Sequence, residues 1–305
     1  MRPILDVKPV LVTVHAHPDD EAIFTGGTIV RAVEAGWLVV LVVATDGDRG
    51  AGKGSTRAEI ATRRRAETRQ AAAVLGVERI VFLGYGDSGY GERADGLRPE
   101  AAIGRGIGPG TLSAAHLDDV VAEVRRIVIE ENAVAVTSYD DNGIYGHVDH
   151  VLVHEVAARC IVGTGCELYE STMDRGAMRS LRDRLVGRGL VPELWPRSLI
   201  ERLGVESGAD VISVDVSGQL DRKLLAIAAH SSQVMEATSF MGLPAGAFHH
   251  LLGSEWFRVA RRGEGRFFDM LCSTGGDGPP SIPGSLADDA TGAERGPFGQ
   301  SPVPA

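Results

Sequence analysis

Short, continuous apolar runs that alternate with helical segments constrain the fold of this chain most strongly. Val10–Val14 and Leu38–Ala44 are rich in valine and leucine and contain no charged residue, which is typical of strands buried in a parallel sheet. Shorter strands are expected over Arg79–Leu83 and Ala133–Ser138. Because helical segments separate these runs, we expect a mainly parallel sheet connected by right-handed crossovers.

The helical segments have apolar residues at helical spacing. They are expected at Ala22–Ala35, Arg57–Leu75, His116–Asn132, His147–Ile161 and Gly218–His230. Further strands are expected around Glu167–Ser171 and at Val211–Val216, and a last helical piece at Phe248–Ala260. The expected fold class is therefore α/β, a Rossmann-like, mainly parallel sheet flanked by helices, with a smaller C-terminal elaboration.

Length and composition restrict the class of protein. With 305 residues, 44% of them hydrophobic, the chain can bury a full core. We expect one domain over residues 1–272 and a disordered Gly/Pro/Ser-rich tail over 273–305. The net charge of −10 argues against a nucleic-acid partner. The cysteines show no CxxC spacing, and the sequence lacks a targeting pattern and an apolar run of about 20 residues. These features favour a soluble, cytoplasmic protein without a membrane partner. The sequence leaves the oligomeric state open, a homo-oligomer included.

Imidazole and carboxylate side chains crowd together where the first apolar run ends, in the sequence HAHPDDE at residues 15–21. Pro18 ends the strand, and Asp19 and Asp20 then lie at a strand-to-helix turn, where open α/β sheets bind ligands. Two adjacent carboxylates repel each other unless a cation lies between them or they serve different tasks. The turn predicts a divalent metal held by His17 and one aspartate, with the other aspartate free to move protons. The alternative is that both aspartates cap a helix and that His17 is a surface residue.

A second polar segment, YDDNGIYGHVDH at residues 139–150, follows a later strand. His147 and His150 are three residues apart at the start of an expected helix, so their rings share one face. Together with His17 and an aspartate, one of them would give two nitrogen ligands, one oxygen ligand and an open fourth position. That donor set is typical of a catalytic zinc site, in which the metal activates water and polarises a carbonyl.

Polar residues follow three of the expected strands, at His17–Asp20, Thr45–Arg49 and Tyr139–His150, and we expect them to converge on one edge of the sheet. The stretch GDRGAGKGS at residues 47–55 nearly matches a P-loop, but Gly54 stands where a Ser or Thr would bind magnesium. We interpret it as a loop that lines a pocket or faces solvent. The long Gly-rich segment Gly84–Ser113 is expected to be a binding loop.

Four motifs carry a resemblance to a known family: AHPDDE at residues 16–21, GDRG at 47–50, YGDSG at 85–89 and YDDNGIYGHVDH at 139–150. Together they resemble the LmbE-like (PIG-L) family of zinc-dependent N-acetylglucosaminyl deacetylases, which includes mycothiol-type deacetylases and amidases. The resemblance implies that His17, Asp20 and His150 bind Zn²⁺, a site that Fe²⁺ or Co²⁺ would also fit.

The resemblance also implies roles for the neighbouring residues. Asp19 would be the general base when zinc-bound water attacks the amide, and His147 the cation that stabilises the oxyanion or protonates the amine. Tyr145 would close over the oxyanion. Asp149 would orient His147 or a ligand histidine.

The implied substrate is a small N-acetylated, or otherwise N-acylated, amino sugar or its conjugate, whose hydroxyls Arg64 and Asp87 would contact. The chain departs from the family at Val148, where proline is usual, so the start of that helix is expected to differ. One alternative is an amidase that acts on a larger thiol conjugate or an acylated natural product. Another is a metal-stabilised binding protein without catalysis. The sequence also leaves open whether His15 and His230 contact the site.

Overall fold

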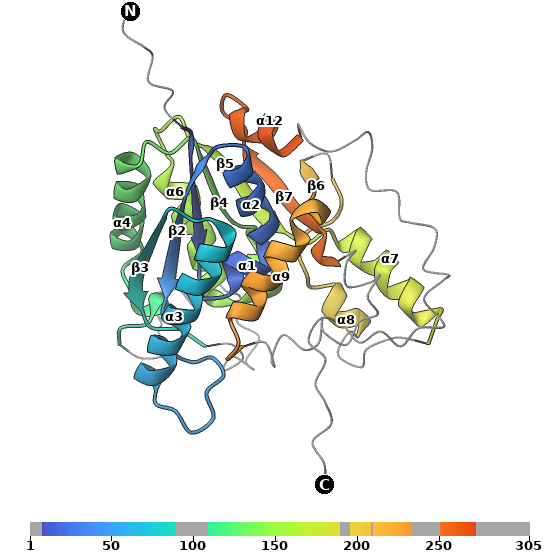
Figure 1. The fold of residues 1–305 in the computed structure, drawn as a ribbon, viewed down its shortest axis with the longest axis horizontal. Helices are drawn as coiled ribbons and strands as arrows, with labels where there is room; N and C mark the ends of the chain where they lie inside the picture. Colours follow the sequence, from blue (N-terminus) through green and yellow to red (C-terminus); the bar gives the residue numbers. More distant parts are fainter. Residues whose placement is uncertain (1–7, 90–108, 190–195, 209, 234–250, 273–305) are drawn as a thin grey trace, which may run out of the picture.

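The computed structural model describes residues 8–89, 109–189, 196–208, 210–233 and 251–272. The expected disordered tail over 273–305 and most of the expected binding loop lie outside the described residues. The strands of the described part are β1 (Val10–His15), β2 (Leu38–Thr45), β3 (Arg79–Tyr85), β4 (Ala135–Tyr139), β5 (Glu167–Thr172), β6 (Val211–Asp215) and β7 (Ser254–Arg261). They form one sheet in the order β3-β2-β1-β4-β5-β7-β6 (Figure 1).

The first five strands of this order are parallel, and β1 lies in their middle, between β2 and β4. The order 3-2-1-4-5 is that of a Rossmann-like sheet. Strand β7 runs antiparallel to both β5 and β6 and extends the sheet on one side. The expected α/β fold class, with a smaller C-terminal elaboration, is therefore confirmed.

Helices cover both faces of the sheet (Figure 1). The helices of the described part are α1 (Asp20–Phe24), α2 (Gly26–Glu34), α3 (Arg57–Leu75), α4 (Leu117–Glu130), α5 (Gly143–Gly146), α6 (Val148–Cys160), α7 (Arg175–Val186), α8 (Arg197–Ile200), α9 (Leu220–Ala229) and α12 (Arg266–Cys272). Helices α4 and α6 pack on one face, and α2, α3 and α9 on the other. Side chains alternate along a strand, so β1 presents Val12 and Val14 to the first layer and Leu11 to the second.

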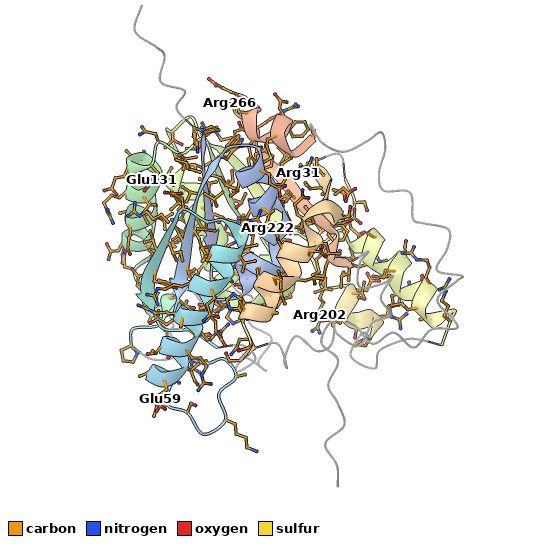
Figure 2. The ribbon with its side chains drawn as sticks, viewed as in Figure 1. Arg31, Glu59, Glu131, Arg202, Arg222 and Arg266 are labelled. Atoms are coloured by element: carbon orange, nitrogen blue, oxygen red, sulfur yellow. The ribbon has the colours of Figure 1, made fainter. Side chains whose placement is uncertain are left out.

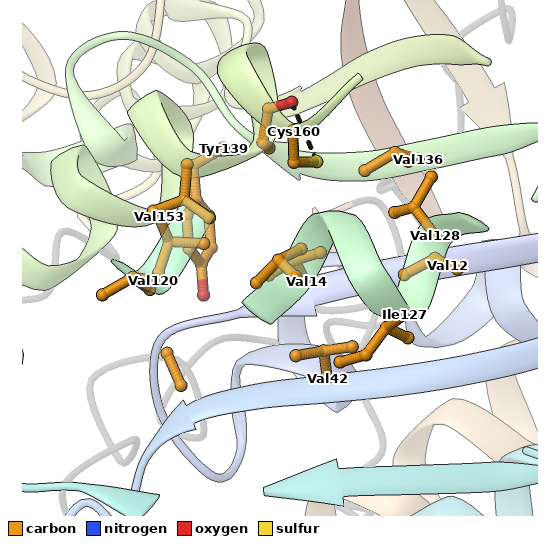
Figure 3. Packing of buried hydrophobic residues seen from close by; sticks show 14 of the residues in the cluster. Val12, Val14, Val42, Val120, Ile127, Val128, Val136, Tyr139, Val153 and Cys160 are labelled. Carbon is orange, nitrogen blue, oxygen red and sulfur yellow. Dashed lines mark hydrogen bonds between the residues drawn. The ribbon is translucent and has the colours of Figure 1, made fainter. Parts of the chain in front are cut away.

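Figure 3 shows the core between the sheet and helices α4 and α6. Val12 and Val14 of β1, Val42 of β2 and Ile127 of α4 are fully buried in it. Burying such a side chain stabilises the fold by about 1.5 to 3 kcal/mol. Tyr139, the last residue of β4, is also fully buried in this cluster. Its phenol hydroxyl therefore needs a hydrogen-bond partner inside the protein.

Arginine side chains join the elements of the other layer (Figure 2). Arg222 of α9 donates hydrogen bonds of 3.1 and 2.8 Å to the carbonyl of Val74. Val74 lies in the last turn of α3, where carbonyls lack a partner within the helix. Arg31 of α2 donates to the carbonyl of Asp215 at the end of β6. These contacts fix α9 against α3, and α2 against the sheet.

The last helical piece that the sequence predicted, Phe248–Ala260, is helical at Leu251 and Leu252 and wrong from Ser254 onward, because Ser254–Arg261 is strand β7. Phe257, which is fully buried, pairs with Ser171 of β5 on one side and Ile212 of β6 on the other. Pairing with strands on both sides outweighs the local spacing of the apolar residues.

The single helix predicted over Ala22–Ala35 is divided into α1 and α2 at Thr25. The Thr25 hydroxyl donates to the carbonyl of Glu21 at 3.1 Å and lies 2.9 Å from the His15 ring. A threonine side chain that bonds to the preceding turn competes with regular helix and bends it. The division also places the start of α2 beside Glu255 of β7, whose carboxylate accepts the N–H groups of Gly27 and Thr28.

Candidate metal centre and active site

The polar segments that follow the parallel strands meet at one edge of the sheet, as the sequence predicted. Asp48, after β2, accepts a hydrogen bond of 2.8 Å from the backbone N–H of Asp87, after β3. The next N–H, that of Ser88, donates to the Asp149 carboxylate on α6 at 2.9 Å. The structure brings together all the site residues that the sequence singled out, namely His17, Asp19, Asp20, Arg64, Asp87, Tyr145, His147, Asp149 and His150.

Three donor atoms from distant parts of the chain face one another. His17 Nδ1 lies 3.2 Å from His150 Nε2 and 3.4 Å from Asp20 Oδ2, and His150 Nε2 lies 3.3 Å from Asp20 Oδ2. Donors bound to one tetrahedral metal at about 2.0 to 2.1 Å are about 3.3 Å apart. The three separations fit that value, so His17, Asp20 and His150 can hold one ion. We call these residues the donor triad.

The second ring nitrogen of His17 is held by a carboxylate. His17 Nε2 lies 3.3 Å from Asp149 Oδ2 and 3.7 Å from Asp87 Oδ1. A carboxylate only accepts hydrogen bonds, so Nε2 carries a proton, and loss of the second proton from Nδ1 would give the lone pair that an ion in the triad needs. Burial opposes protonation of the ring, but Asp87, Asp149 and Asp20 outweigh it and hold the pKa of His17 well above its usual value. The sequence left open whether Asp149 orients His147 or a ligand histidine, and this contact favours the ligand histidine.

Asp20 is oriented by Tyr139, a residue that the sequence did not single out. The Tyr139 hydroxyl donates to Asp20 Oδ2 at 2.8 Å and accepts the backbone N–H of Ala16 at 2.8 Å. His15 Nδ1 lies 3.2 Å from the same hydroxyl. Burial is the main reason that the pKa of His15 falls to about 4, so the ring is neutral. His15 is thus a buried support behind the site. Its signal in the sequence was its position two residues before His17, on the same side of the strand.

His150 is fixed mainly by ring contacts. The Tyr139 ring stacks on it, with centroids 4.1 Å apart and planes at 13°. The Tyr145 hydroxyl lies 3.2 Å from His150 Nε2. His150 Nδ1 is buried and has no hydrogen-bond partner among the described residues. Stacking therefore holds this ring in place of the hydrogen bond that usually orients a ligand histidine.

Asp19 occupies an unusual backbone conformation beside the triad, with φ 106° and ψ −29°. Its side chain is 21% exposed, and Asp19 Oδ2 accepts a hydrogen bond of 3.0 Å from Arg64 Nη2. Arg64 also donates to the carbonyls of Pro18 and Gly47. Burial, opposed by Arg64 and reinforced by the charge of Asp20, raises the pKa of Asp19 to about 6. A carboxylate in that range can accept and return a proton near neutral pH.

His147 is the N-cap of α6, and its Nδ1 accepts the backbone N–H of Asp149 at 3.1 Å. In the neutral ring the proton is therefore on Nε2, which makes that atom a donor. Burial, together with the charges of His17 and His150, lowers the pKa of His147 to about 3. The ring is neutral in this arrangement, and the cationic role that the family resemblance implied for His147 stays a prediction. The capping role also shows that α6 starts normally although Val148 replaces the usual proline.

The site concentrates negative charge in a buried space. Single donor atoms of His17, Asp87, His147 and Asp149 lie within 4.8 Å of one another, and all four residues are buried. Asp20 adds a further carboxylate that is only 4% exposed. Buried carboxylates require a cationic partner or a metal. The charge of the pocket thus supports the same conclusion as the geometry of the donor triad.

Residues 12–161 match the family model PIG-L, described as GlcNAc-PI de-N-acetylase. A relative from Kineococcus radiotolerans, named 1D-myo-inositol 2-acetamido-2-deoxy-alpha-D-glucopyranoside deacetylase, is 34% identical over 256 residues, which cover 75% of this chain and 70% of the relative. The chain belongs to the PIG-L (LmbE-like) family. The family resemblance that the four motifs carried is thereby confirmed.

Two further relatives extend this result along the chain. A deacetylase of the same name from Thermobispora bispora is 30% identical over 295 residues, which cover 88% of this chain and 94% of the relative. The solved structure of N,N'-diacetylchitobiose deacetylase from Pyrococcus horikoshii matches with a TM-score of 0.54 at 21% identity, over 83% of this chain and 84% of that one. The structural match shows that the PIG-L domain shares its fold with this enzyme. In the described ranges of the chain, every helix is too short or too polar to cross a membrane.

Proposed function

We propose that this chain is a metal-dependent N-deacetylase that hydrolyses the acetamide of a small N-acetylated amino sugar or its conjugate. The observation that carries the proposal is the donor triad, whose three separations of 3.2, 3.3 and 3.4 Å suit one tetrahedral ion. The relatives named as deacetylases of an acetamido-glucopyranoside linked to inositol support this substrate class.

His17, Asp20 and His150 would hold the ion. Two imidazoles and one carboxylate suit Zn²⁺, and Fe²⁺ or Co²⁺ fit the same ligands. When bound, such an ion supplies Lewis acidity, which polarises the amide carbonyl and makes a water molecule a better nucleophile at neutral pH. Asp149 keeps the His17 ring in the required tautomer, and Tyr139 keeps the Asp20 carboxylate aimed at the triad.

Asp19 would move the proton of that water. Its carboxylate is partly exposed and adjoins the triad residue Asp20, while Arg64 fixes one of its oxygens. Asp19 takes the proton as the water oxygen bonds to the amide carbon. It then returns the proton to the amine nitrogen as the carbon–nitrogen bond breaks, so that acetate and a free amine leave.

Negative charge that develops on the amide oxygen needs donors close by. His147 offers Nε2–H, because its Nδ1 is occupied by the backbone N–H of Asp149. The Tyr145 hydroxyl, 3.2 Å from His150 Nε2, would serve as a second donor. Asp87 faces His17 Nε2, and its role would be to accept a sugar hydroxyl at the edge of the pocket.

We further propose that the chain works in the cytoplasm as one catalytic domain. Cys160 and Cys166 are free thiols, which suits a reducing cytoplasm. The catalytic domain would extend over residues 1–272.

Release of a free amine and of acetate from purified protein tests the proposed function. The panel would contain N-acetylglucosamine, its inositol glycoside and amides with larger acyl groups or thiol-conjugated aglycones. We expect turnover of the small N-acetyl sugars, its loss after chelation, and its return when one equivalent of Zn²⁺ or Fe²⁺ is added. Turnover confined to the larger amides would favour the amidase alternative. A protein that contains metal and is inert on the whole panel would contradict the proposal.

A further inference from the structure

Asp19 lies in the left-handed region of backbone space, which residues other than glycine rarely adopt. Such a conformation persists only where its surroundings hold it in place, and it is often found at functional sites. Arg64 provides one restraint, through Asp19 Oδ2 and the carbonyl of Pro18. The Pro18 carbonyl and the Asp19 N–H belong to one planar peptide, so Arg64 holds that peptide by its oxygen and leaves its N–H for a second partner.

Glu21 provides that restraint. Its Oε2 accepts the backbone N–H of Asp19 at 3.0 Å, and its Oε1 lies 2.6 Å from His230 Nε2. Glu21 is fully buried and His230 is 2% exposed. The two oxygens of one carboxylate therefore connect the catalytic turn to the end of α9, more than two hundred positions away in the chain.

The end of α9 is itself fixed to α3. Glu67 of α3 accepts hydrogen bonds from the backbone N–H of Ser232 at 2.8 Å and from the Ser232 hydroxyl at 2.7 Å. Arg64, on the same helix, holds Asp19 from the other side. His230 is therefore a fixed donor, and it holds the Glu21 carboxylate at the Asp19 N–H.

We propose that Glu21 and His230 form a positioning pair that keeps Asp19 in its left-handed conformation, with the carboxylate beside the donor triad. The inference deepens the proposed function, since it assumes that Asp19 moves the proton of the reaction. Among the described residues, the side chains of Glu21 and His230 bond to the Asp19 N–H and to each other, and not to a side chain of the donor triad. Their contribution is to the geometry of Asp19 and leaves the binding of the ion unchanged.

The contact between the pair and Asp19 is tested by hydrogen exchange at the Asp19 amide, followed by NMR on the metal-loaded full chain. His230→Phe removes the donor and keeps a ring, while His230→Gln keeps an N–H donor. Tyr169→Phe is the matched control, because it removes a buried 2.8 Å hydrogen bond to another glutamate, Glu167, at the start of β5. We expect His230→Phe to speed exchange at Asp19 at least tenfold, and His230→Gln and Tyr169→Phe to leave it within twofold of wild type. The proposal would be overturned if the Asp19 amide exchanged at the wild-type rate in His230→Phe, or if Tyr169→Phe accelerated that exchange equally.

The consequence for catalysis is tested by kinetics on the same proteins. We expect His230→Phe to lower kcat by about 10- to 100-fold, as loss of an orienting partner typically does, with KM and bound metal unchanged and with recovery in His230→Gln. In an Asp19→Asn background, His230→Phe should lower kcat less than twofold further, because both changes act on one group. Full additivity of the two changes, or loss of metal in His230→Phe, would refute the positioning role. If the wild type hydrolyses no amide, the proposed function fails, whereas the exchange experiment still decides on the positioning pair.

Discussion

Two turns build the site, and each contains one residue other than glycine with positive φ. The first turn, residues 17–21, has Asp19 at 106°, and the second, residues 140–147, has Ile144 at 64°. In the first turn the strained residue is the proposed base itself. In the second it precedes Tyr145, and its own side chain is completely buried in the core. The residue in the strained conformation thus carries a reactive carboxylate in the first turn and a buried apolar side chain in the second.

The two turns are also held differently. Groups from distant elements hold the first, namely Arg64 of α3 and His230 at the end of α9, which acts through Glu21 of the turn itself. The second is held largely by the Asp140 carboxylate within the turn, which accepts the N–H groups of Asn142 and Ile144 at 3.0 and 2.8 Å. Damage to the supports of the first turn should therefore affect turnover, whereas damage to those of the second should affect stability.

The largest expected effect is that of Asp19→Asn. Because it removes the proton acceptor, kcat should fall by about 10²- to 10⁴-fold. The donor triad stays intact, so bound metal measured by mass spectrometry should equal that of wild type. Asp141→Asn, at an aspartate of the second turn that is 63% exposed, is the matched control and should keep wild-type turnover. Equal turnover in both variants would remove Asp19 from the mechanism.

An intermediate effect is expected from Tyr139→Phe, because this residue joins the two turns. Its hydroxyl orients Asp20 of the first turn, and its backbone leads into the second. Loss of the hydroxyl should weaken metal affinity by about 10- to 100-fold. Competition with a fluorescent chelator measures the change, with Tyr169→Phe as the reference for loss of a buried phenol. Unchanged affinity would mean that Asp20 needs no orienting partner.

The smallest effect on turnover is expected from Thr172→Val. The Thr172 hydroxyl donates to Asp140 Oδ2 at 2.5 Å, so its removal leaves a buried carboxylate short of one donor. The free energy of unfolding, from urea titration, should fall by about 1 to 3 kcal/mol, and kcat should fall less than tenfold.

Thr137→Val provides the control for that experiment. The Thr137 hydroxyl is buried and has no partner among the described residues, so its loss should cost no stability. If Thr172→Val abolished turnover while leaving stability intact, the contrast between the two turns would be wrong.

The sequence predicted the parallel part of the sheet because its strands are local apolar runs. It predicted the meeting of His17 with His150 because the carboxyl ends of parallel strands share one edge. By contrast, β7 depends on β5 and β6 for its backbone pairing, and Trp256 and Phe257 carry no local signal of those partners. Local spacing therefore suggested a helix where tertiary pairing made a strand.

The supports of the site were harder to predict than its reactive groups. His17, Asp20 and His150 are residue types that typically bind metals, whereas a tyrosine such as Tyr139 is also common in a hydrophobic core. The contact between Glu21 and His230 joins residues with no motif in common, so only the packing of α9 against α3 reveals it. What could have pointed to Tyr139 as a support of the site is that its phenol lies at the end of β4, at the same edge of the sheet as the donor triad.

The donor triad also bears on how the protein is made. Its two histidines are 133 positions apart, and the strand that precedes the first lies in the middle of the parallel strands. A ribosome therefore releases His17 long before His150 exists, and the early chain offers only part of a chelate. Ion capture must wait until β4 has joined the sheet and α6 has formed, so occupancy by metal reports that β1, β4 and α6 have assembled.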